Sequence, residues 1–104
     1  MQIQVHADSS VKAGQGVAQA AESAVEGAVH RWTRRITRVE VHLSDVNRHK
    51  GGADDKRCVM EARVGGLEPI TVTNTAATLL EAIDGAAVKL QKTLQSTLGR
   101  LNEH

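Results

Sequence analysis

The sequence of 104 residues has almost no aromatic side chains, one cysteine and one proline. Trp32 is its only Phe, Trp or Tyr, which argues against nucleic-acid-binding folds that stack bases on exposed rings. The single cysteine, Cys58, excludes an intramolecular disulfide and a four-cysteine zinc site. No apolar run approaches the ~20 residues of a membrane span, and no signal-peptide pattern opens the chain. These absences predict a soluble, cytoplasmic protein with no membrane partner.

The length and charge of the chain predict one ordinary domain over residues 1–104. The formal net charge is only +1, which is far from the bulk charge of a histone-like protein. The charge is uneven, however, because residues 30–63 hold nine basic residues against five acidic ones. Four arginines in this segment lie within eight positions: Arg31, Arg34, Arg35 and Arg38. Such a cluster can bind phosphate, and it is equally consistent with a solvated helix end.

The periodicity of apolar residues predicts six secondary-structure elements. Alternation with period two predicts strands over residues 2–6, 36–44, 56–64 and 69–73, with a loop over residues 46–55. Helical spacing predicts helices over residues 14–32 and from Thr78 to about Leu101, where Thr78 and Glu81 form a capping box. The order is β-α-β-β-β-α, and each element has one apolar side. The sequence therefore predicts an α+β two-layer sandwich, with both helices on one face of a four-stranded sheet.

The alternation also predicts which side chains share a face of the sheet. Val41 and Cys58 belong to the apolar face, whereas the opposite face carries arginine, histidine and glutamate, which we expect to form Arg–Glu pairs across strands. Trp32 ends the apolar stripe of the first helix and is expected to be a core anchor. Gly85, inside the last helix, is expected to allow a close approach of the sheet or of the other helix.

Metal binding and catalysis are the weaker readings of this sequence. Several potential ligands cluster around the predicted hairpin, namely His42, Asp45, His49, Asp54, Asp55 and Cys58. They show no H-x-x-x-H or C-x-x-C spacing, and strand parity places His42 and Cys58 on opposite faces. We therefore assign no catalytic residue, metal ligand or cofactor, expect no small-molecule substrate, and predict that the chain is not an enzyme.

Two stretches carry a resemblance to a known family: VEVHLS (Val39–Ser44) and AIDGAAVKLQKTL (Ala82–Leu94). They resemble the ribosome hibernation-promoting factors, also called ribosome-associated inhibitor A or sigma-54 modulation proteins, in their short form. The resemblance implies a double-stranded-RNA-binding-domain-like fold. It also implies a non-enzymatic stress or stationary-phase factor that binds the small ribosomal subunit through ribosomal RNA and represses translation. We expect no C-terminal dimerisation domain, since the sequence stops after the last helix.

The expected RNA-binding residues form two groups. Arg31, Arg34, Arg35 and Arg38 follow the first helix, and Lys89, Lys92 and Arg100 share one face of the last helix over about 16 Å. Arg34, Arg35 and Arg38 are expected to contribute more than Lys89, Lys92 and Arg100, because a guanidinium binds phosphate through two hydrogen bonds. Ser96 and Leu98 stand where short members of the family often carry lysine. An alternative therefore remains open, in which the same fold binds another RNA or a protein and has weakened or lost ribosome binding.

Overall fold

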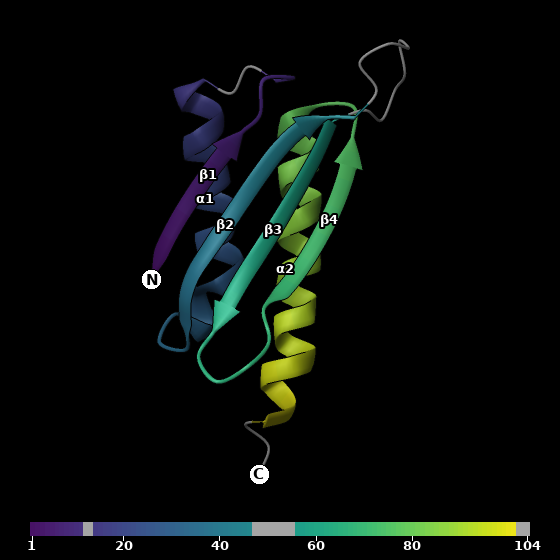
Figure 1. The fold of residues 1–104 in the computed structure, drawn as a ribbon. Coiled ribbons are helices and arrows are strands. Elements are labelled where there is room, and N and C mark those ends of the chain that lie inside the picture. The colour runs from purple at the N-terminus through teal and green to yellow at the C-terminus, as the bar shows by residue number, and fades with distance from the viewer. Residues whose placement is uncertain (12–13, 47–55, 102–104) are drawn as a thin grey trace.

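Four strands form one mixed sheet, and both helices pack against the same face of it (Figure 1). The computed structural model describes residues 1–11, 14–46 and 56–101, without the side chains of residues 100 and 101. Its elements are β1 (Gln2–Ala7), α1 (Gln15–Val29), the short 3-10 helix η1 (His30–Trp32), β2 (Ile36–Asp45), β3 (Lys56–Val64), β4 (Ile70–Ala76) and α2 (Leu79–Leu101).

The sheet has the strand order β1-β2-β3-β4. β1 pairs with β2 in parallel, and α1 makes the crossover between them. β2, β3 and β4 form antiparallel pairs, so β1 and β4 are the two edges. α1 contacts β1 and β2, α2 contacts β3 and β4, and the two helices contact each other. The predicted two-layer α+β fold is confirmed.

Side-chain alternation explains why only one face of the sheet is covered. Val39, Val41 and Leu43 of β2 and Cys58, Met60, Ala62 and Val64 of β3 are buried against the helices. α2 contributes fully buried Ile83, Leu90, Leu94 and Leu98, and α1 contributes mainly small residues, including Ala21, Val25 and Ala28. The small side chains of α1 let its backbone lie close to the sheet and to α2. Trp32 is 5% exposed, which confirms its prediction as a core anchor.

Two element boundaries differ from the sequence prediction by more than one residue. The first helix ends at Val29, and residues 30–32 form a 3-10 turn that buries the indole of Trp32. β4 extends to Ala76, beyond the predicted end at Thr73, because β3 is long enough to pair with it as far as Lys56. Val46 lies just beyond β2, and the rest of the predicted loop, residues 47–55, lies outside the described residues.

The start of α2 is fixed by two polar contacts. The backbone N–H of Glu81 donates to Thr78 Oγ1 over 3.1 Å, as the predicted capping box requires. Asn74 of β4 donates from Nδ2 to the carbonyl oxygen of Ala82 over 3.2 Å. A Cβ atom on Gly85 would lie 2.7 Å from Asn74 Cγ, so glycine is what permits this approach, and the predicted role of Gly85 is confirmed. Neither described helix is both long and apolar enough to cross a membrane.

Candidate nucleic-acid interface

The turn between α1 and β2 holds three of the four clustered arginines. Burial of Trp32 in the core leaves Arg31 and Arg34 on the outside of this turn. The backbone N–H of Arg35 donates to the carbonyl of Trp32 over 2.9 Å, and the Arg35 carbonyl accepts from Gly65 over 3.0 Å. The arginine turn is therefore fixed to the β3–β4 turn, at the end of the molecule where α2 finishes (Figure 1).

Arg31 and Arg34 are the most available cations of this turn. Both side chains are exposed, and no carboxylate among the described residues pairs with either. The Arg31 guanidinium lies 5.6 Å from the centre of the Trp32 ring, which orients its stem while leaving its N–H groups available. Arg35 is half-buried. For the remainder of this subsection and the Discussion, the arginine turn means residues 31–35.

Arg38 is separated from the other three arginines by the strand geometry. It lies on the outer face of β2, opposite the helices, where its Nη2 atom is 3.0 Å from Glu40 Oε2. Its Nε atom is buried and lacks a hydrogen-bond partner within the described chain. Proximity in sequence therefore grouped four arginines that the fold divides into an arginine turn and a member of the sheet face.

Arginine and glutamate side chains form a network of ion pairs on the outer face of the sheet. Glu40 faces Glu61 across β2 and β3, and Arg38 faces Arg63 at the next pair on the same face, two residues along each strand. Arg63 lies 3.4 Å from Glu61 Oε1 and 4.0 Å from Glu40 Oε2, so each like-charged pair is bridged by a residue of opposite sign. The expected Arg–Glu pairing across strands is met only by the diagonal contact of Arg63 with Glu40, because the register sets like charges directly opposite each other and the shorter Arg–Glu contacts lie within single strands.

The cations of α2 also differ from one another. Lys89 donates from Nζ to the carbonyl oxygen of Thr73 over 2.8 Å, which ties the middle of α2 to the edge strand β4. Lys92, one turn further on, is exposed, and no partner for its ammonium group occurs within the described residues. The side chain of Arg100 is outside the described part, so the predicted three-residue ridge is seen only at its first two members.

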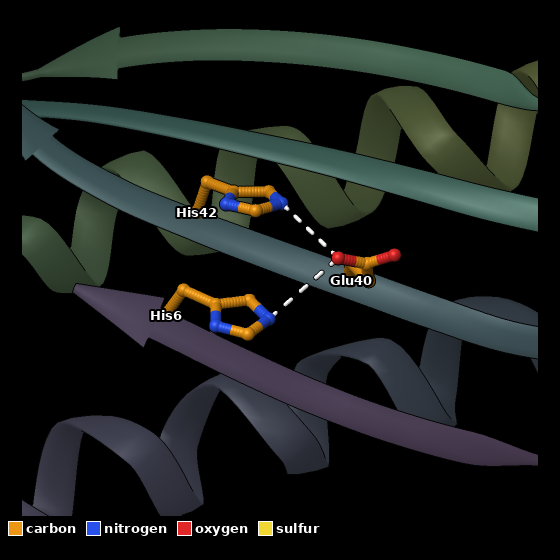
Figure 2. A group of neighbouring side chains, drawn as sticks. All are labelled: His6, Glu40 and His42. Carbon is orange, nitrogen blue, oxygen red and sulfur yellow. Dashed lines mark ion pairs between the residues drawn. The ribbon is translucent and has the colours of Figure 1, made fainter. Parts of the chain in front are cut away.

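The predicted separation of His42 from Cys58 is confirmed. Cys58 is fully buried among the helices, and burial raises the pKa of its thiol to about 12, which suits an inert packing residue. His49, Asp54 and Asp55 lie outside the described residues. His42 instead meets His6 and Glu40 on the outer face, where one ligand atom from each lies within 4.8 Å of the others (Figure 2).

Sequence reasoning missed His6 as a member of this group. His6 and His42 are 36 positions apart, and only the register of the parallel pair, in which they are direct partners, brings them together. Alternation alone placed His42 and Glu40 on one face. The parallel pairing of the first two strands was predictable, and the apolar Ile3 and Val5 fix the face that His6 takes. A shift of the register by two residues would keep that face and would separate His6 from His42.

The described surface therefore offers two kinds of cationic group. Arg31, Arg34 and Lys92 have no ion-pair partner among the described residues, whereas Arg38, Arg63 and Lys89 contact oxygen atoms of the protein. Cations of the first kind can contact a phosphate backbone without losing an internal contact. With Trp32 buried, the described chain has no exposed aromatic ring of Phe, Trp or Tyr on which a base could stack. Such a surface recognises the shape and charge of a nucleic acid and does not read its sequence.

Comparisons with known proteins agree with this fold. Residues 3–102 match a family model described as sigma 54 modulation protein / S30EA ribosomal protein. A ribosomal subunit interface protein from Coxiella burnetii superposes with a TM-score of 0.76 at 17% identity, covering 95% of this chain and 99% of that one. The N-terminal domain of Protein Y from Thermus thermophilus gives 0.74 at 16% identity, covering 93% and 99% respectively. No curated protein sequence matches this chain.

Proposed function

Because this chain belongs to the sigma 54 modulation protein / S30EA ribosomal protein family, we propose that it is a ribosome-associated hibernation factor. In this proposal it binds the small ribosomal subunit through ribosomal RNA and represses translation in resting or stressed cells. The observation that carries the proposal is the arginine turn, where Arg31 and Arg34 project from a buried Trp32 without carboxylate partners in the described chain.

The proposed mechanism is steric competition for a binding site on the small subunit, and it involves no chemical reaction. Guanidinium groups of the arginine turn and the ammonium group of Lys92 contact phosphates, which positions the domain on folded RNA. The rigid two-layer fold then fills a channel that messenger RNA and transfer RNA would otherwise use. Repression follows because the bound protein and these RNAs compete for the same space on the small subunit.

The direct test is a titration of the full chain against isolated small and large ribosomal subunits at several salt concentrations. We expect preferential binding to the small subunit. If about four phosphates are neutralised, affinity falls by roughly three powers of ten for each tenfold rise in salt. Cell-free translation measured in parallel should fall as small subunits become occupied. Salt-independent binding, or equal affinity for both subunits, would contradict the proposal.

One observation favours a second candidate function. α1 exposes Glu22 and Glu26 and contains no lysine or arginine, so one of the two helices offers no cation for RNA. A domain of the same fold that binds a protein partner through this acidic helix would fit the observation. In that case ribosomal subunits would fail to bind the chain even at low salt, although the fold and thermal stability would be intact.

A further inference from the structure

We propose that His6, Glu40 and His42 form a binding site for a divalent transition-metal ion, best matched by zinc, on the outer face of the sheet (Figure 2). The site lies outside the arginine turn and α2, and its occupancy does not depend on ribosome binding. The donor atoms are the Nε2 atoms of the two imidazoles and one carboxylate oxygen.

The backbone places these three residues on a rigid frame. His6 of β1 and His42 of β2 are direct partners in the parallel register. Glu40 precedes His42 by two positions and therefore shares its face of β2. β2 is an inner strand, paired on both sides, so the positions of Glu40 and His42 are fixed by the sheet itself. Ligands carried by paired strands hold their relative positions better than ligands on loops.

The spacing of the donor atoms fits a shared ion better than a hydrogen bond. Both Nε2 atoms lie 3.6 Å from the same oxygen, Glu40 Oε1, which is too long for a hydrogen bond. Around tetrahedral zinc, with bonds of about 2.0–2.1 Å, neighbouring donor atoms lie about 3.3 Å apart. Each Nε2–Oε1 distance therefore needs to shorten by only a few tenths of an ångström, whereas the ligand nitrogens of the two histidines, which lie within 4.8 Å of each other, approach further as the rings turn.

The imidazole rings have the freedom that this closure needs. They stack with centroids 4.8 Å apart and planes inclined by 17°, so each ring must turn about its Cβ–Cγ bond to aim Nε2 at a common point. Both side chains are about half exposed, at 50% and 51%. Glu40 is the only polar partner of either ring among the described residues, so turning breaks no hydrogen bond to the protein there.

The chemistry of the donor set selects the class of metal. Two neutral imidazoles and one carboxylate are characteristic of zinc sites that keep a fourth position for water. Nitrogen donors favour zinc, copper or nickel over magnesium or calcium, which prefer oxygen. The fourth position would lie on the solvent side, because both imidazoles are half exposed.

Arg38 orients the carboxylate. Its guanidinium lies 3.0 Å from Glu40 Oε2, which leaves Oε1 facing the two histidines. A hydrogen-bonded outer partner of this kind fixes the orientation of a metal ligand. Apart from the ligand Glu40, the neighbouring charges are Arg38, Arg63 and Glu61, so the surroundings add one net positive charge beside the ion. Arg38 is a positioning residue in this site and not a ligand.

The test is equilibrium binding of Zn²⁺ to the chelator-treated full chain, with Co²⁺ as a spectroscopic probe. We expect one ion per chain and visible Co²⁺ absorption typical of four-coordinate nitrogen and oxygen ligation. His6→Ala, His42→Ala and Glu40→Gln should each weaken binding at least about tenfold. His30→Ala is the matched control, because His30 is exposed on the 3-10 turn and should leave the affinity unchanged.

Two outcomes would overturn the proposal. Equal zinc affinity in the parent chain and in a His6→Ala/His42→Ala double variant would show adventitious binding by other surface groups. If the parent chain bound no metal, or gave the Co²⁺ spectrum of octahedral coordination, the proposed four-coordinate site would be excluded, whatever the variants showed. Far-UV circular dichroism of each variant establishes that the sheet is intact, which the half-exposed positions of His6 and His42 and the nearly isosteric change at Glu40 should permit.

Discussion

The outer sheet face and the arginine turn both carry arginine, yet their arginines are used differently. On the sheet face, Arg38 and Arg63 form ion pairs with Glu40 and Glu61. These ion pairs offset the repulsion between the two glutamates, which face each other. In the arginine turn, Arg31 and Arg34 have no carboxylate partner within the described chain. Counting arginines along the sequence cannot distinguish the two situations, and only the unpaired group is available to a phosphate without loss of an internal contact.

The largest expected effect is on the affinity for small ribosomal subunits. It is measured with two double variants of equal net charge, Arg31→Gln/Arg34→Gln and Arg38→Gln/Arg63→Gln. In a titration against small ribosomal subunits at one fixed salt, we expect the turn variant to lose about tenfold to a hundredfold in affinity, because two phosphate contacts disappear. The sheet variant should lose about threefold or less. Equal losses would mean that net charge alone governs binding, and a larger loss from the sheet variant would place the RNA on that face.

The second effect concerns the placement of α2, on which its cations depend. Gly85→Ala should destabilise the fold by about 1–2 kcal/mol, since the new methyl group displaces Asn74 from its hydrogen bond to the Ala82 carbonyl. In an Asn74→Ala background the same change should stabilise the fold by up to ~1 kcal/mol, because alanine is the better helix former. Urea denaturation of the four members of this cycle measures both values.

If Gly85→Ala lowers the free energy of unfolding in the parent chain and raises it in the Asn74→Ala background, residue 85 and Asn74 are in direct contact. If Gly85→Ala costs the same with and without Asn74, the glycine serves some other purpose, and the close approach of β4 to α2 does not control the position of the helix.

The third effect is on stability and runs opposite to the first. Arg38→Gln/Arg63→Gln leaves Glu40 and Glu61 facing each other without cations, which should cost about 1 kcal/mol. Arg31→Gln/Arg34→Gln should cost roughly 0.5 kcal/mol or less, mainly through the lost contact of Arg31 with Trp32. Thermal melts at low and high salt provide the measurement. High salt should reduce the difference in melting temperature between the two variants, because it screens the repulsion between the glutamates. If Arg31→Gln/Arg34→Gln were the less stable variant, the ion pairs of the sheet face would not stabilise the fold as expected.

Much of the fold could be predicted because its signals are local. The leucine spacing of α2, the alternation of Val39, Val41 and Leu43, and the capping box at Thr78 each lie within one element. The contact between Asn74 and Gly85 was half predictable. The glycine indicated a close approach, but its partner is on another element, and nothing near Asn74 in sequence marks it.

The candidate sites could be predicted less well, because they depend on pairing between strands. In the sequence, Arg38 belongs to a cluster of arginines. In the fold it lies on the outer face of β2, where its side chain contacts Glu40 and is separated from the arginine turn. His6 gained its significance only from the register that sets it beside His42. Residue type and spacing therefore identified candidate cations, whereas tertiary pairing decided which of them remain free of internal partners.

The smallest expected effect tests the same contrast within α2, where one lysine is tied to the sheet and its neighbour is not. Lys92→Met should lower affinity for small subunits about threefold to fivefold, through the loss of one phosphate contact. Lys89→Met removes the same charge at similar side-chain length, yet should lower affinity about twofold or less, because its ammonium group already donates to Thr73. Its main effect should be a small fall in melting temperature, since that hydrogen bond between α2 and β4 is lost. If Lys89→Met reduced binding as much as Lys92→Met while the melting temperature stayed constant, the contact with Thr73 would not restrict the lysine in solution. Internal pairing would then be a poor guide to which cations bind RNA on α2.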